Sequence, residues 1–190
     1  MKEYFKPALI LLIICFVTVG AVSAVFDITK EQIKALEEKT KQENMQRVLP
    51  DADSFETEIL NLEIEQYGAT ILEVDTGYKN GSVAGYVYMV VTSGYGGDVV
   101  VLTGIDQTGA VTGVIMGDNN ETPGLGREAA KSRFTDQFVG AKEATLKVVK
   151  SSGTAQNEID SVSGATFTSK AITKAVNAAL DHFIEKGGLK

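Results

Sequence analysis

Residues 160–172, DSVSGATFTSKAI, hold the densest group of side chains that could do chemistry. The stretch is rich in Ser and Thr hydroxyls. It leads into a segment whose apolar spacing predicts a helix over residues 167–186. Three uses fit such a helix entrance: an ordinary cap by Thr166 or Thr168, a nucleophile, or a binding site for phosphate.

A phosphate site has a physical basis here. The N-terminus of a helix presents free N–H groups and a partial positive charge, which favour an anion. Ser163 and Thr166 add hydroxyl donors, and the small residues Gly164 and Ala165 let a ligand come close to the backbone. Spacing alone leaves this interpretation and the plain helix cap open.

Other chemistry is poorly supported. Ser163, Asp181 and the single histidine, His182, could form a hydrolytic triad, but SVSGA is not the G-x-S-x-G nucleophile elbow. The single cysteine, Cys15, lies in an apolar run, so we predict no metal site. GLGREA at residues 124–129 matches G-x-G-x-x-A, yet it follows a polar turn instead of a buried parallel strand.

Composition sets the broad class. The net charge of the 190 residues is −7 and there is no basic stripe, so we expect no nucleic-acid partner. Residues 7–26 are uncharged and about 30 Å long as a helix, the thickness of a bilayer core. This predicts a single-pass anchor; the AVSA at residues 21–24 leaves a cleaved signal peptide as the alternative.

The chain divides into four predicted parts. These are a cytoplasmic tail (1–6), a transmembrane anchor (7–26), a helical stalk (27–54) and an extracytoplasmic domain (55–190). Short β-rich runs separated by turns predict an antiparallel meander over residues 55–117. We also predict a helix over 126–138 and a strand or a short mixed segment over 141–150. The expected fold class is α+β, an antiparallel sheet with flanking helices.

Two motifs resemble a known family. DSVSGAT, residues 160–166, resembles the D-x-x-[S/T]-G-A-T acceptor motif of FMN-binding domains. ETPGLG, residues 121–126, resembles the loop that lies against the flavin in that family, and GYGGDV at residues 94–99 is also similar. With one span in front, the chain resembles the G subunits of the Rnf electron-transport complex. It is also similar to the C subunits of the sodium-translocating NADH:quinone reductase.

The resemblance implies a covalent flavoprotein. Thr166 would carry FMN as a phosphoester, Ser163, Gly164 and Ala165 would shape the phosphate niche, and Asp160 would belong to the pattern that a flavin transferase reads. The residues expected against the flavin, mainly through backbone, are Glu121, Thr122, Gly124, Leu125 and Gly126.

The expected function is electron relay. The chain would be a redox subunit of an ion-translocating ferredoxin:NAD oxidoreductase complex, with the other membrane subunits as partners and no catalytic acid or base of its own. Lys2 and Lys6 favour an extracytoplasmic domain on a cell-membrane anchor. The alternatives are a stand-alone flavoprotein of extracellular electron transfer and a non-redox binding module.

Overall fold

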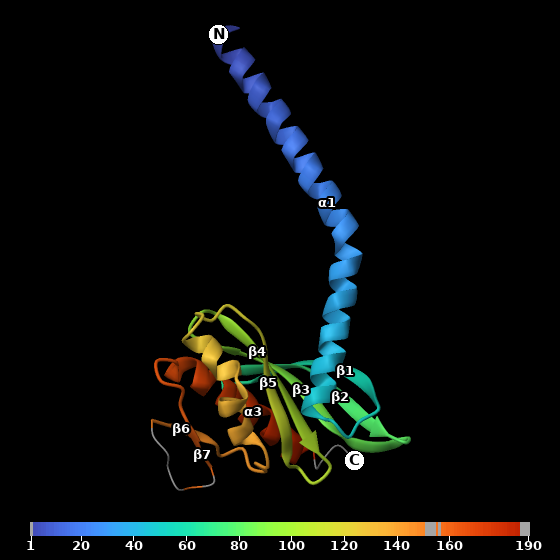
Figure 1. Ribbon diagram of the computed structural model, residues 1–190, viewed down its shortest axis with the longest axis vertical. Helices are drawn as coiled ribbons and strands as arrows, with labels where there is room; N and C mark the ends of the chain where they lie inside the picture. Colours follow the sequence, from blue (N-terminus) through green and yellow to red (C-terminus); the bar gives the residue numbers. More distant parts are fainter. Residues whose placement is uncertain (1, 151–154, 156, 187–190) are drawn as a thin grey trace. The chain divides into compact units, whose positions relative to one another are not determined.

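The computed structural model describes residues 2–150, 155 and 157–186, and its contacts divide the chain into units 1–43 and 44–190, each described by itself below. Figure 1 shows the helices and strands. In chain order they are α1 (Lys2–Val48), β1 (Ser54–Ile64), β2 (Ala69–Lys79), β3 (Ser82–Ser93), β4 (Asp98–Asp106), β5 (Val111–Asn119), η1 (Gly126–Ala130), α2 (Ser132–Thr135), η2 (Asp136–Phe138), β6 (Lys147–Val149), β7 (Glu158–Asp160) and α3 (Thr166–Glu185).

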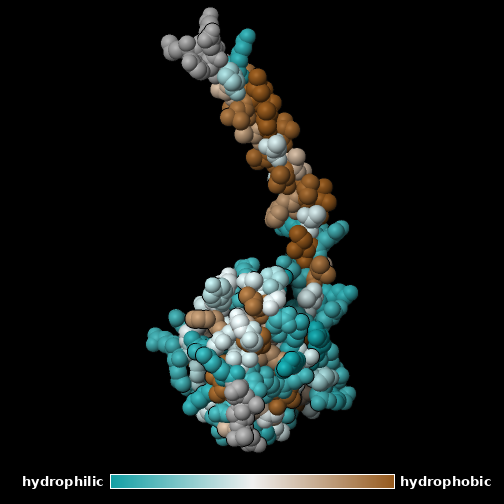
Figure 2. Space-filling model, turned by 60° about the vertical axis from the view of Figure 1, so that its left-hand side comes forward, coloured by the Kyte–Doolittle hydropathy of each residue, from teal (hydrophilic) through white to brown (hydrophobic). Residues whose placement is uncertain are grey.

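The first unit is the N-terminal part of α1. Its large apolar side chains between Leu9 and Phe26 are exposed, and they cover this part of the helix in Figure 2. By length and composition α1 is the candidate membrane span of the described residues. The predicted anchor and stalk form one continuous helix as far as Val48. The predicted divisions at residues 6, 26 and 54 stay predictions.

The second unit is built on a five-stranded sheet in the order β1-β2-β3-β4-β5. All four neighbouring pairs are antiparallel, which confirms the predicted meander. The turn between β2 and β3 has Asn80 and Gly81 at φ +50° and +79°. Two positive φ values are what a type I′ hairpin requires, and Asn-Gly adopts them at little cost.

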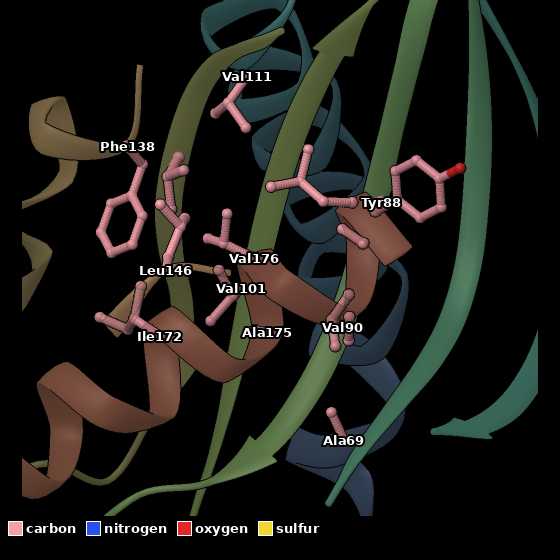
Figure 3. Packing of buried hydrophobic residues seen from close by; sticks show 14 of the residues in the cluster. Ala69, Tyr88, Val90, Val101, Val111, Phe138, Leu146, Ile172, Ala175 and Val176 are labelled. Carbon is pink, nitrogen blue, oxygen red and sulfur yellow. The ribbon is translucent and has the colours of Figure 1, made fainter. Parts of the chain in front are cut away.

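One face of the sheet packs against α3. Side chains alternate between the faces of a strand, so Tyr86, Tyr88 and Val90 of β3 all lie in the same core cluster. Figure 3 shows Val90 beside α3, whose residues Ile172, Ala175 and Val176 belong to this cluster as well. This packing holds α3 against the sheet.

The opposite face is covered by the end of α1 and the segment after it. Met45, Val48, Leu49 and Ala52 form a second buried cluster, which includes Val87 of β3. These residues belong to the second unit, which begins at Asn44.

One prediction between β5 and α3 needs correction. The expected helix over 126–138 is broken into η1, α2 and η2. The break between η1 and α2 lies at Lys131, which has extended backbone angles, φ −80° and ψ 147°. Residues 141–150, expected as a strand or a short mixed segment, contain the short strand β6, which pairs in parallel with the unpredicted strand β7.

Candidate functional site

The hydroxyl-rich motif is a tight connection between β7 and α3. Asp160 ends β7, and its backbone N–H donates to Oε1 of Gln137 at 2.7 Å. The Ala165 N–H donates to the Val162 carbonyl at 3.0 Å, and Gly164 between them has φ +77°. That left-handed conformation favours glycine, because a Cβ would be strained there.

The helix cap interpretation does not hold. The N-cap residue of α3 is Ala165, and it makes no side-chain hydrogen bond to the helix. Thr166 is the first helical residue and is half-buried. Thr168 is 1% exposed, and its hydroxyl has no hydrogen-bond partner among the described residues. Neither Thr166 nor Thr168 therefore caps the helix. The hydroxyl that bonds at this helix start is that of Ser169, which accepts from the Val162 N–H at 3.1 Å and donates to the Ala165 carbonyl at 2.9 Å.

A cavity of about 270 Å³ lies at the start of α3. It is lined by Tyr95, Glu121, Thr122, Leu125, Gly126, Gly164, Ala165, Phe167 and Thr168. The two motifs, some forty residues apart in the sequence, thus form one site. Ligand pockets typically measure about 300–1,000 Å³, so the cavity holds part of a nucleotide-sized ligand and leaves the rest at its mouth.

The predicted site residues divide into three groups. Those that line the cavity are Glu121, Thr122, Leu125, Gly126, Gly164 and Ala165. Asp160 and Ser163 line a neighbouring surface cavity of about 630 Å³ instead. Gly124 and Thr166 line neither, although Thr166 lies between the cavity-lining residues Ala165 and Phe167 in the chain.

Three lining residues were not predicted: Tyr95, Phe167 and Thr168. The rings of Tyr95 and Phe167 have their centroids 6.2 Å apart at an interplanar angle of 55°. Both are largely exposed, at 75% and 71%, and Leu125 beside them is 47% exposed. The mouth of the cavity is therefore apolar and aromatic. The GYGGDV motif was a signal for Tyr95, while Phe167 had none.

The charged group of the cavity is Glu121, which is 2% exposed. Its Oε1 accepts hydrogen bonds from the backbone N–H groups of Tyr95 at 2.7 Å and Gly96 at 3.3 Å. Its own backbone is held by the Asn119 side chain and by Nε of Arg127, which donates to the Glu121 carbonyl at 3.1 Å. Glu121, in the loop after β5, is therefore linked to the loop after β3 that holds Tyr95 and Gly96.

The residues that line the cavity fit part of an FMN molecule. The cavity supplies apolar and aromatic surface for a planar ring system, and the helix start supplies N–H groups for a phosphate. Glu121 and Thr168 supply buried polar atoms that lack protein partners among the described residues. Over the same part of the chain, no group of His, Cys, Asp and Glu side chains could hold a metal ion.

Comparison with known proteins gives a consistent result. Residues 94–181 match the family model described as FMN-binding domain, and residues 1–48 match the one described as RnfG N-terminal region. The first match contains both motifs and all residues that line the cavity.

Curated relatives match over nearly the whole chain. The G subunit of the Na(+)-translocating ferredoxin:NAD(+) oxidoreductase complex of Acetobacterium woodii is 38% identical over 190 residues, covering 94% of this chain and 91% of that protein. The G subunit of the ion-translocating oxidoreductase complex of Methanosarcina acetivorans is 29% identical over 189 residues, covering 98% of each.

A solved structure shares the fold. The crystal structure of the C subunit of the Na(+)-translocating NADH-quinone reductase from Parabacteroides distasonis has a TM-score of 0.63 and 21% identity, covering 82% of this chain and 95% of that chain. At this identity the likeness confirms the expected α+β architecture and nothing beyond the fold.

Proposed function

The chain belongs to the family of G subunits of Rnf-type ion-translocating oxidoreductase complexes, and from this premise we propose that it is an electron carrier that binds FMN. The flavin would accept and pass on electrons between neighbouring redox subunits of the complex. The protein would supply position, shielding from water and electrostatics, as is usual for cofactor proteins. The chain is then one redox component of a larger assembly rather than an enzyme by itself.

We further propose that FMN is attached through its phosphate to the Thr166 hydroxyl. One observation carries this proposal. The cavity, whose lining residues all lie in the part of the chain that matches the FMN-binding domain, is at the start of α3, where Thr166 is the first helical residue. A phosphate there would meet the free N–H groups of the helix. Thr166 is half-buried, so an enzyme that delivers an activated flavin phosphate could reach its hydroxyl.

The linkage would be made by a flavin transferase. Thr166 Oγ1 would form a new P–O bond and lose its proton, while the bond from phosphorus to the leaving group of the donor breaks. Asp160 and Ser163 line a different cavity from the one at the start of α3. This position supports their role in recognition by the transferase, separate from the residues that would contact the bound flavin.

Denaturing gel electrophoresis tests the attachment. The protein is produced with a flavin transferase, and we expect a fluorescent flavin band from the wild type and none from Thr166→Val. Thr173→Val is the matched control and should keep the band, because Thr173 is also on α3 but is 3% exposed and does not line the cavity. A dark wild-type band contradicts covalent attachment. A flavin mass on a peptide without Thr166 contradicts the assigned residue alone.

The remaining proposals concern location and partners. An apolar helix at the N-terminus and the family of the chain support membrane anchoring. We propose that the domain lies on the extracytoplasmic side. Activity of a reporter that works only in the cytoplasm, fused after residue 190, would contradict this. Co-purification with multi-span membrane subunits is expected. Its failure with flavin-loaded protein would favour a stand-alone flavoprotein, and colourless protein would favour a non-redox module.

A further inference from the structure

The Glu121 carboxylate is buried with one oxygen unsatisfied. Both N–H groups that bind it, from Tyr95 and Gly96, donate to Oε1. Oε2 has less than 1 Å² of exposed surface and no partner among the described residues. Buried polar atoms are nearly always hydrogen-bonded, and an unpaired carboxylate oxygen is among the most costly exceptions. A partner for Oε2 is therefore expected from a bound ligand.

Glycines on two sides leave room for this carboxylate. A Cβ on Gly94 would overlap Oε1, and a Cβ on Gly126 would overlap Oε2. The loop after β3 and the start of η1 therefore both approach the carboxylate more closely than any other residue type would permit. Side chains at these two positions would push the carboxylate aside, so glycine at both positions leaves room for it beside the cavity.

No other charged side chain lines the cavity in the part of the chain that the structure describes. The second polar atom without a partner is the Thr168 hydroxyl, on the α3 side. A flavin fits this pair, since its N–H and ribityl O–H groups donate hydrogen bonds and its ring nitrogens and carbonyls accept them. Glu121 Oε2 can only accept when ionised, whereas Thr168 Oγ1 can do both.

We propose that Glu121 is the positioning residue that sets the reduction potential of the bound flavin. It accepts a hydrogen bond from the flavin through Oε2, and its negative charge opposes the addition of electrons to the nearby ring. Water screens this charge poorly, because the Glu121 side chain is 2% exposed. Coulomb interactions are stronger in the protein interior than in water, since the effective dielectric constant is lower there. The inference rests on the proposed function, since it requires FMN in this cavity.

The test compares Glu121→Gln with wild-type protein, both loaded covalently with FMN. Glutamine keeps the shape and an acceptor for the Tyr95 and Gly96 N–H groups but removes the charge. Spectroelectrochemical titration should give a more positive midpoint potential for Glu121→Gln. The control is Glu128→Gln, which removes an equal charge from η1 outside the cavity and should leave the potential unchanged. Equal potentials for Glu121→Gln and the control overturn the inference.

A second measurement needs no variant. The infrared difference spectrum between oxidised and reduced wild-type protein should contain a shifted carboxylate band, because the flavin's charge changes beside Glu121. The absence of any carboxylate band overturns the inference even if Glu121→Gln fails to fold. The denaturing gel distinguishes failure of the proposed FMN attachment from failure of the proposed role of Glu121. A wild-type band without flavin contradicts the attachment. Flavin-labelled Glu121→Gln with the midpoint potential of the wild type overturns the role of Glu121 alone.

Discussion

Leu125 Cδ2 lies 2.9 Å from the place that a Cβ on Gly164 would occupy. This contact joins the two sequence motifs, because Leu125 belongs to ETPGLG and Gly164 to DSVSGAT. Gly164 is also the left-handed residue of the acceptor loop, with φ +77°. The loop that presents Thr166 is therefore limited by its own backbone conformation and by the facing motif.

Gly164→Ala is expected to destabilise the domain more than a left-handed φ alone would explain. The control Gly140→Ala has φ +87° but nothing within 4 Å of its Cβ, so it carries only the conformational cost. That cost is about 1–2 kcal/mol, or roughly 2–8 °C in Tm for a domain of this size. Thermal unfolding should show a larger loss for Gly164→Ala.

The double variant Gly164→Ala with Leu125→Ala separates the two causes. If the contact adds to the cost, removing the Leu125 side chain should recover part of the stability lost in Gly164→Ala, giving a favourable interaction energy in the double-mutant cycle. Full additivity of the two single changes would contradict a direct contact between the motifs.

The aromatic pair at the mouth should quench flavin fluorescence in the native protein. Tyr95 and Phe167 both line the cavity, so their rings would contact a flavin bound there. Aromatic pairs favour offset or tilted geometries. We expect Tyr95→Leu to raise the native fluorescence yield of loaded protein, since tyrosine quenches excited flavin by donating an electron. The denatured gel band should stay unchanged, because Tyr95 does not carry the linkage.

Tyr78→Leu serves as the control for Tyr95→Leu. Tyr78 is on β2, does not line the cavity, and bonds Glu56 through its hydroxyl. Its substitution should leave the native fluorescence yield as in the wild type. Equal yields for Tyr95→Leu and Tyr78→Leu would show that the Tyr95 ring does not contact the flavin.

The sequence predicted the sheet well because its signals are local. Asn80-Gly81 marks a hairpin turn by itself, and β-rich runs between such turns dictate antiparallel neighbours. The fold class could therefore be predicted from these local signals, and the family from its motifs. The strand β7 was not, because a three-residue strand has too few positions for alternation and depends on its pairing with β6.

The site was predictable only where a motif names it. ETPGLG and DSVSGAT gave most of the lining residues, but motif membership did not predict that Ser163 and Asp160 line a different cavity. The place of Tyr95 depends on hydrogen bonds from its loop to Glu121, 26 residues later. Such a long-range contact leaves no periodic or compositional trace in a single sequence.

The start of the folded domain can be located by truncation. A chain that begins at Asn44 keeps Met45, Val48 and Leu49, which are at most 3% exposed, whereas one that begins at Asp51 loses them. Each such side chain contributes roughly 1.5–3 kcal/mol when buried, and a whole domain has about 5–15 kcal/mol of stability. Circular dichroism with urea should show cooperative unfolding for the first chain and a large loss of stability for the second. Equal midpoints would contradict the role of this cluster.

The stability of the domain should fall as the pH falls below the ordinary pKa of histidine. His182 is 3% exposed on α3, and Nδ1 lies 3.5 Å from the Tyr88 hydroxyl. Burial lowers the pKa of His182 from 6.5, with a further decrease from Lys186 that Glu185 and Glu58 oppose. In this range the unfolded chain binds more protons than the native state, so the free energy of unfolding rises with pH and is lost as the pH falls through and below 6.5.

Thermal unfolding of the domain from Asn44 between about pH 5 and pH 7.5 measures this effect, since unperturbed carboxyl groups titrate mainly below that range. Wild-type Tm should decrease toward pH 5. His182→Gln removes the titrating group while keeping a polar side chain near Tyr88, so its Tm should change less over the same interval. Parallel Tm profiles for the two proteins would show that protonation of His182 does not destabilise the fold, and that other groups carry the pH dependence.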